Sequence, residues 1–290
     1  MAIVGASGFI GRALVRELAG RGTRPVGVVR SIVGVQSVRE AGGEARLGPL
    51  TDREFLGKSF EGCGAVVYLA GATRESRPGD FWRVHVEGVA ASLDAARTAG
   101  VPRFILFGSL GAGGYGARPV LTNEYFRTKR EGERRAEASR LPALILRPGY
   151  IIGPGDRMAT VLAEGARAGR VLMRGDGAYR LQPLALADAV RAAVVGMERG
   201  ITGTFDLVGP ESVTHREFLD RLFAVMRRKR LLASAPDVRR VPLQERADLS
   251  PEERDILTCD EVGDPGPAVR WLGPLTSLDA ALDAALLPTR

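Results

Sequence analysis

A glycine-rich loop directly after the first apolar stretch constrains this chain more than any other feature. Residues Ala2–Val4 predict a buried strand, and Ile10–Ala19 has the apolar spacing of a helix. Glycines between a strand and a helix permit a tight turn and a close approach of backbone to ligand, and the helix N-terminus offers free N–H groups. The sequence therefore predicts a dinucleotide site, with a plain glycine turn as the alternative. The loop residues expected at the pyrophosphate are Gly5, Ser7, Gly8, Phe9, Ile10 and Gly11.

The first 150 residues alternate strand patterns with helical patterns. This alternation predicts an α/β fold, a Rossmann-type doubly wound parallel sheet whose ligands bind at the carboxyl ends of the strands. The predicted strands are Ala2–Val4, Pro25–Val29, Ala45–Leu47, Ala65–Leu69, Phe104–Phe107 and Ala143–Leu146. The predicted helices are Ile10–Ala19, Ile32–Glu40, Arg53–Phe60, Phe81–Ala99 and Tyr125–Ser139.

The pattern loosens after Gly149. Residues 233–275 are rich in Pro, Asp and Arg and are expected to be mostly irregular. We predict a dinucleotide-binding domain over residues 1–150, to which residues 183–208 return, and a smaller substrate-capping region over 151–182 and 209–290. The elements expected here are helices at Met158–Ala168, Asp188–Glu198, Thr214–Arg228 and Ser277–Leu287, and a strand at Thr204–Val208.

Charge and composition narrow the partners. The net charge is +7, but the basic residues are scattered and no zinc-finger or RNP-type motif is present, so we expect a solvated basic surface and no nucleic-acid partner. Two cysteines and two distant histidines indicate neither a disulfide framework nor a metal site. The N-terminus lacks a secretory pattern and no apolar run approaches about 18 residues, so a cytoplasmic location is the default expectation.

The helical segment His215–Leu232 carries apolar residues on one side and has a basic tail. Such a face packs into a protein core more often than onto lipid, so peripheral membrane association is the less favoured alternative. The apolar residues are Phe218, Leu219, Leu222, Phe223 and Met226.

The end of the second predicted strand bears on the choice of cofactor. Enzymes that bind NAD usually place Asp or Glu there, but this strand ends with Arg30 and Ser31. A planar guanidinium with several donors suits a ribose 2′-phosphate. We therefore predict NADP as the cofactor, bound through Arg30 and Ser31, with NAD less favoured.

Five segments together resemble the short-chain dehydrogenase/reductase superfamily, in its extended and atypical branch of NAD-dependent epimerase/dehydratase-like proteins. Tyr125–Lys129 matches the YxxxK motif, and Phe107–Ser109 stands where the family carries its catalytic serine. Ala70–Ala72 is similar to the cofactor-lining turn after the fourth strand. Residues 147–156 and 182–190 resemble the RPxxxxGPGD and QPVHVDDVA segments of nucleoside-sugar epimerases.

The resemblance covers roughly residues 1–210 well and implies a specific site. It implies a catalytic set of Ser109, Tyr125 and Lys129. The cofactor contacts it implies are Leu50, Ala70, Gly71, Ala72, Tyr125, Lys129 and Pro148. Within the superfamily the chain resembles most the subgroup of the NADPH-binding accessory subunit of respiratory complex I, through the RTKxEGE core in Tyr125–Arg134 and through Val262–Pro265. Family members often dimerise, so a homodimer is one possible oligomeric state.

Tyr125 and Lys129 are four residues apart on a predicted helix and therefore share a face. A free tyrosine has a pKa of about 10, and a neighbouring ammonium and an oxidised nicotinamide are both expected to lower it. Ser109 is expected to hold a substrate oxygen near Tyr125. We predict an NADP(H)-dependent oxidoreductase or epimerase-like enzyme acting on a carbonyl, an alcohol or a sugar-nucleotide-like substrate. The alternative is a non-catalytic NADP(H)-binding sensor or accessory subunit.

Several residues depart from the family pattern or lack an assigned role. His85 stands where many members have Asn, and a packed or cofactor-side histidine is favoured over a catalytic one. The first Asp of a GDLxD motif is absent, which leaves the adenine to the backbone or to Leu50. Arg147 is expected to be structural. Contact of an anionic substrate with Arg174, Tyr179 and Arg180 is less favoured than simple solvation.

Overall fold

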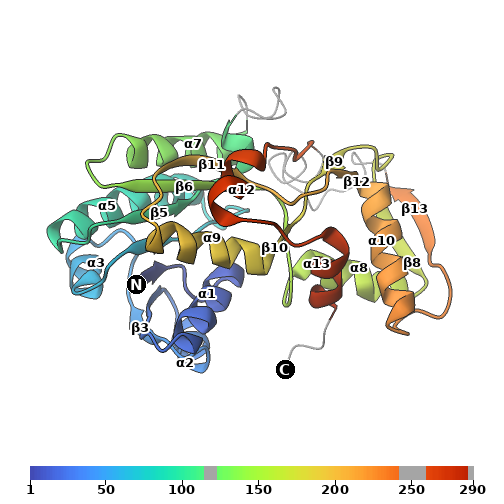
Figure 1. The fold of residues 1–290 in the computed structure, drawn as a ribbon, viewed down its shortest axis with the longest axis horizontal. Helices are drawn as coiled ribbons and strands as arrows, with labels where there is room; N and C mark the ends of the chain where they lie inside the picture. The colour runs from blue at the N-terminus through green and yellow to red at the C-terminus, as the bar shows by residue number, and fades with distance from the viewer. Residues whose placement is uncertain (114–122, 242–258, 287–290) are drawn as a thin grey trace.

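The structure is a computed structural model, and it describes residues 1–113, 123–241 and 259–286 (Figure 1). Its central element is a sheet of seven strands in the order β11-β6-β5-β4-β1-β2-β3, all paired in parallel. The order reverses between β1 and β4, which is the switch point where ligands bind in such sheets. The strands are β1 (Ala2–Val4), β2 (Val26–Val29), β3 (Glu44–Leu47), β4 (Val66–Tyr68), β5 (Phe104–Phe107), β6 (Ala143–Pro148) and β11 (Gly203–Leu207). The predicted Rossmann-type fold is confirmed.

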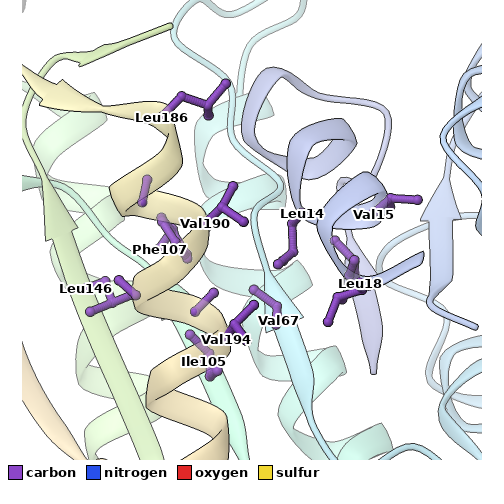
Figure 2. Close-up of a cluster of buried hydrophobic side chains, with 14 of the residues drawn as sticks. Leu14, Val15, Leu18, Val67, Ile105, Phe107, Leu146, Leu186, Val190 and Val194 are labelled. Carbon is purple, nitrogen blue, oxygen red and sulfur yellow. The ribbon is translucent and has the colours of Figure 1, made fainter. Parts of the chain in front are cut away.

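Helices cover both faces of this sheet because successive strand residues point to opposite sides. One face packs against α1 (Phe9–Gly20), α2 (Ile32–Glu40) and α9 (Leu186–Glu198). In Figure 2, Leu14 of α1 and Val194 of α9 lie over Val67 and Ile105 of the sheet. The other face packs against α3 (Arg53–Phe60), α5 (Gly88–Thr98) and α7 (Glu124–Glu137).

A second, smaller core lies beside the sheet, over α8 (Arg157–Arg167), α10 (His215–Arg228) and α13 (Leu278–Ala285) (Figure 1). The apolar face of α10 is buried in this core, so it packs within the protein as expected. Three two-stranded sheets complete the region. They pair β7 (Ile151–Ile152) with β10 (Leu184–Ala185), β9 (Arg180–Leu181) with β12 (Val213–Thr214), and β8 (Arg170–Arg174) with β13 (Asp237–Val241).

One prediction of local structure was wrong, and another left out two short elements. The predicted helix Phe81–Ala99 is interrupted, because α4 (Asp80–Trp82) runs into a π-helical turn at Arg83–Glu87 before α5. The stretch 233–275 was expected to be mostly irregular, yet it contains β13 and α12 (Gly266–Leu272). β13 forms through parallel pairing with β8, which is far away in sequence. Its own residues therefore carry no local pattern that predicts a strand. Residues 242–258 lie outside the described part. Among the described residues, no helix has both the length and the apolar character of a membrane span.

Candidate active site

A cavity of about 200 Å³ opens at the carboxyl ends of β1, β2 and β4. It lies at the switch point of the sheet, where the fold places a dinucleotide. Of the predicted cofactor residues, the cavity is lined by Gly5, Ser7, Gly8, Arg30, Leu50, Ala70, Gly71 and Ala72. Gly48 and Leu50, from the segment that corresponds to GDLxD, both line this cavity. The backbone and the apolar side chain of this segment therefore take the place of the absent first Asp.

The glycines of the loop are required by close backbone packing. Gly5 has φ +88°, and a Cβ there would lie 2.7 Å from the backbone nitrogen of Ala70. A Cβ on Gly11 would lie 2.4 Å from the carbonyl oxygen of Gly5. Gly8 precedes α1 without a side-chain cap, and Phe9, Ile10 and Gly11 begin the helix, where N–H groups have no intrahelical partner. The loop therefore fits a pyrophosphate.

Arg30 and Ser31 differ in what they do at the end of β2. The Arg30 side chain is exposed, lines the cavity and makes no ion pair within the described residues. The Ser31 hydroxyl accepts a hydrogen bond from the Gly34 N–H at 3.1 Å, so it caps α2. Arg30 is therefore available to a ligand, whereas Ser31 already has a structural partner.

The predicted Ser-Tyr-Lys set comes together between β5 and α7. Ser109 follows β5 at the start of a 3₁₀ turn, Leu110–Gly113, and it hydrogen-bonds Tyr125. The Lys129 Nζ donates to the carbonyl oxygen of Phe107 at 3.2 Å. The same Nζ lies 3.6 Å from where a Cβ on Gly71 would be. Lys129 therefore lies between the end of β5 and the turn at Ala70–Ala72.

The protonation states in this set differ from our expectation. Burial raises the pKa of Tyr125 to about 12, opposed by the hydrogen bond from Ser109 and reinforced by the negative charge of Glu261. Burial lowers the pKa of Lys129 to about 8, opposed by the negative charge of Glu133. The pKa of Tyr125 therefore lies above its ordinary value, and Lys129 is not among the groups that shift it. Tyr125 holds its proton at neutral pH.

His85 is a packed, cofactor-side residue, as favoured from the sequence. Its Nε2 accepts a hydrogen bond from the Ala72 N–H at 3.1 Å, and its Nδ1 lies 2.9 Å from Thr128 Oγ1. Because Nε2 accepts, Nδ1 carries the proton. Burial lowers the pKa of His85 to about 2, helped by the positive charge of Lys129. A neutral His85 therefore joins the cofactor-lining turn to α7 and does not transfer protons near neutral pH.

Sequence reasoning missed Glu133, which lies one turn beyond Lys129 on α7. Glu133 is completely buried, and Arg147 donates to it from both Nε and Nη2. This pairing confirms the structural role expected for Arg147, which is followed by Pro148 at the end of β6. The signal was available, because Glu133 is four residues from Lys129 on the same helical face.

Sequence reasoning also missed an acidic group beside Tyr125. The Glu261 carboxylate accepts a hydrogen bond from the Tyr150 N–H, and burial raises the pKa of Glu261 to about 7. The hydroxyl of Tyr150 donates to Asp156, which caps α8 through the Met158 N–H at 2.9 Å. Glu261, Tyr150 and Asp156 therefore form a chain of contacts near Tyr125.

Tyr179 and Arg180, for which contact with an anionic substrate was the less favoured alternative, have structural partners. The Arg180 guanidinium donates to the hydroxyl of Ser212 at 3.0 Å and to its carbonyl oxygen at 2.8 Å. The Tyr179 ring stacks on His215. Nothing is described of the Arg174 side chain. Within the described residues, no group of three or more His, Cys, Asp or Glu is arranged to hold a metal ion.

Both the sequence and the fold are similar to those of known proteins. The model of the NAD dependent epimerase/dehydratase family matches residues 1–209. A ceramide reductase of Caulobacter vibrioides is 34% identical over 239 residues, which are 82% of this chain and 74% of that protein. The crystal structure of UDP-glucuronic acid 4-epimerase from Bacillus cereus, in complex with UDP-glucuronic acid and NAD, superposes with a TM-score of 0.78 at 19% identity, over 98% of this chain and 96% of that one.

The subgroup expected from the sequence receives weaker support. A mouse mitochondrial NADH dehydrogenase [ubiquinone] 1 alpha subcomplex subunit 9 is 29% identical over 170 residues, covering 56% of this chain and 43% of that protein. That match is shorter than the match to the ceramide reductase. The likeness to the complex I subunit is therefore distant, and the expectation that it is the nearest subgroup was wrong.

Proposed function

Since this chain belongs to the NAD dependent epimerase/dehydratase family, we propose that it is an NADP(H)-dependent reductase that converts a ketone into an alcohol with Ser109, Tyr125 and Lys129. The observation that carries the proposal is the hydrogen-bonded pair of Ser109 and Tyr125, next to Lys129 and the cofactor-lining turn. Reduction needs a hydride at the carbonyl carbon, which bound NADPH supplies as it becomes NADP⁺, and a proton at the oxygen.

The side chains divide the remaining work. Tyr125 is protonated at neutral pH, so it is suited to give its proton to the oxygen as negative charge develops there. Ser109 positions the same oxygen through its hydroxyl. The ammonium of Lys129 stabilises the tyrosinate that is left behind. The protonated state of Tyr125 favours reduction over alcohol oxidation, which needs a base.

Two alternatives are less well supported. An epimerase-like reaction is suggested by the fold of UDP-glucuronic acid 4-epimerase, but that similarity is a likeness of fold alone. A non-catalytic sensor or accessory subunit is suggested by the shorter match to the NADH dehydrogenase subunit. Against the latter stands the complete Ser109, Tyr125 and Lys129 set.

The preference for NADP over NAD is a proposal that rests on Arg30. The exposed guanidinium lines the cavity at the end of β2, and no carboxylate stands at that position to bind a ribose 2′-hydroxyl. The test is a titration of cofactor-stripped protein with NADPH and with NADH, for wild type and Arg30→Ala. We expect NADPH to bind more tightly, and the preference to be lost in the variant. Equal binding that Arg30→Ala does not change would contradict the assignment.

Catalysis is tested by following NADPH oxidation with a panel of aliphatic and acyl-substituted ketones. We expect wild type to oxidise NADPH with at least one ketone, and Tyr125→Phe to bind NADPH normally without turnover. Binding of NADPH with no turnover of any ketone or sugar nucleotide would support the non-catalytic alternative. Turnover that Tyr125→Phe leaves intact would remove Tyr125 from the mechanism.

A further inference from the structure

The Glu261 carboxylate lies within the catalytic site without using all of its hydrogen-bonding capacity. Its negative charge raises the pKa of both Tyr125 and Tyr150, so it is close to both side chains. One oxygen, Oε2, is buried and has no hydrogen-bond partner among the described residues. A Cβ on Gly149 would lie 3.7 Å from this oxygen. Glu261 therefore lies against the turn at Gly149 and Tyr150, and near Tyr125.

Backbone contacts hold Glu261 in this position. Its N–H donates to the carbonyl oxygen of Arg180 at 2.8 Å, and the residue forms a parallel bridge with Leu181. Two residues further on, the Gly263 N–H donates to Gln182 Oε1 at 3.0 Å. The carboxylate itself accepts from the Tyr150 N–H. These contacts fix where the carboxylate points, so its place beside Tyr125 is built into the fold.

Within the described residues, Glu261 forms no ion pair. Arg147 pairs with Glu133, the Arg180 guanidinium binds Ser212, and Lys129 donates to the carbonyl oxygen of Phe107. A buried carboxylate oxygen without a donor destabilises a protein unless a bound molecule supplies the donor. Sites that hydrogen-bond a substrate O–H or N–H discriminate strongly against analogues that lack it. The arrangement is that of a recognition group for a substrate.

We propose that Glu261 is a specificity residue, which accepts a hydrogen bond from an N–H or O–H group carried by the substrate next to the reacting carbonyl. By the same charge it disfavours substrates that bring a phosphate or carboxylate to this position. The preferred substrate class is therefore a neutral ketone with an adjacent amide or hydroxyl. This inference rests on the proposed ketone reduction. It adds to that proposal the hydrogen-bond donor that the substrate carries next to its carbonyl.

The test compares two ketones that differ by one donor, a 2-acylamino ketone and the 2-acyloxy ketone of the same chain length. Replacing N–H by O removes the donor without adding bulk. NADPH-dependent kcat/KM is measured at pH 8 for wild type, Glu261→Met and Asp260→Asn. Asp260 is the matched control, because it lies in the same segment and accepts from the Arg180 N–H at 2.7 Å.

We expect wild type to prefer the 2-acylamino ketone by about tenfold or more, as for a hydrogen bond to a charged group. Glu261→Met should bring the ratio close to one by losing activity on that ketone, whereas Asp260→Asn should keep the preference. A wild-type ratio near one, or a preference that survives in Glu261→Met, overturns the inference. Loss of the preference in Asp260→Asn as well also overturns it, because the segment as a whole would then set the ratio.

A second readout separates this inference from the proposed reaction. If wild type reduces neither ketone, the reductase proposal fails, and binding of the two corresponding alcohols to protein loaded with NADP⁺ is measured by calorimetry. Tighter binding of the N–H alcohol that Glu261→Met abolishes still supports Glu261 as the recognition group. Equal binding of both alcohols to wild type overturns it.

Discussion

Arg147 donates two hydrogen bonds to one carboxylate oxygen of the completely buried Glu133, from Nε at 2.9 Å and from Nη2 at 2.8 Å. The other oxygen of Glu133 faces the backbone N–H of Ser109 at 3.4 Å. A Cβ on Gly108 would lie 2.1 Å from that same oxygen, so only glycine fits there. The ion pair therefore lies next to the Ser109 backbone and one helical turn from Lys129.

Arg147→Met should be strongly destabilising, because it leaves the buried Glu133 carboxylate with only the longer ion pair to Arg130, at 3.4 Å. The expected loss in the free energy of unfolding is about 3–5 kcal/mol, measured by urea denaturation. Arg134→Met is the control, since Arg134 pairs with Glu131 at the surface and its loss should change stability by less than about 1 kcal/mol. Equal losses in the free energy of unfolding for the two substitutions would show that the buried ion pair stabilises the fold no more than the surface pair does.

Tyr125→Phe should abolish proton transfer and leave the fold intact. A positioned general acid contributes about 10²–10⁴-fold to a rate, so kcat for ketone reduction should fall by that factor. The Kd for NADPH, measured by fluorescence titration, should stay within about twofold because the ring and its packing against His85 remain. A fall in kcat of less than tenfold would be inconsistent with Tyr125 as the proton donor.

The sheet was largely predictable because its signal is local. β1, β5, α2 and α3 have the bounds expected from apolar runs and helical spacing. The two-residue strands of the capping region were not predictable, because a pair such as β7 and β10 is too short to show a period and forms only through its partner. β13 carries charged residues and is paired only because β8 lies beside it.

The site shows the same division between local and long-range signals. Ser109, Tyr125 and Lys129 follow from a motif on known elements, and Glu133 continues the same helical face. Glu261 could not be found, because its place is set by a bridge to Leu181, far away in sequence, within a stretch that has no periodicity. Its recognition as a site residue required the tertiary structure.

The pH dependence of reduction should report Lys129. Burial lowers the pKa of Lys129 to about 8, so the ammonium is present below that pH and is lost above it. Tyr125 stays protonated, since its pKa is about 12. We therefore expect kcat/KM for ketone reduction to fall as the pH rises through about 8, and Lys129→Met to have a lower kcat/KM without this limb. A wild-type profile that is flat between pH 7 and pH 9 would contradict the assignment.

Gly5→Ala should prevent cofactor binding by displacing the loop. The substitution combines a strained φ of +88° with a Cβ only 2.7 Å from the Ala70 backbone nitrogen. Gly62→Ala is the matched control, because Gly62 has φ +71° but nothing within 4 Å of its Cβ position. Both variants should lose about 1–2 kcal/mol of stability from backbone strain. Gly5→Ala alone should lose NADPH affinity, by at least tenfold; equal affinities in the two variants would refute the close-packing argument.

Glu261→Gln should stabilise the cofactor-free protein at pH 8. Burial raises the pKa of Glu261 from 4.5 to about 7. The folded state therefore binds more protons than the unfolded state between these values, and the stability contributed by this group falls as the pH rises through that window. Above about pH 7 the penalty is fully present. It amounts to at most about 3–4 kcal/mol, and a smaller effect is expected because the side chain is only partly enclosed. Removing the charge should raise the free energy of unfolding at pH 8 and have little effect at pH 4.5, as measured by urea denaturation at both values.

A stabilisation that depends on pH in this way would show that Glu261 is held in place at the expense of stability, as expected of a group kept for substrate recognition. Destabilisation at pH 8 would instead make its carboxylate a structural acceptor for the Tyr150 N–H.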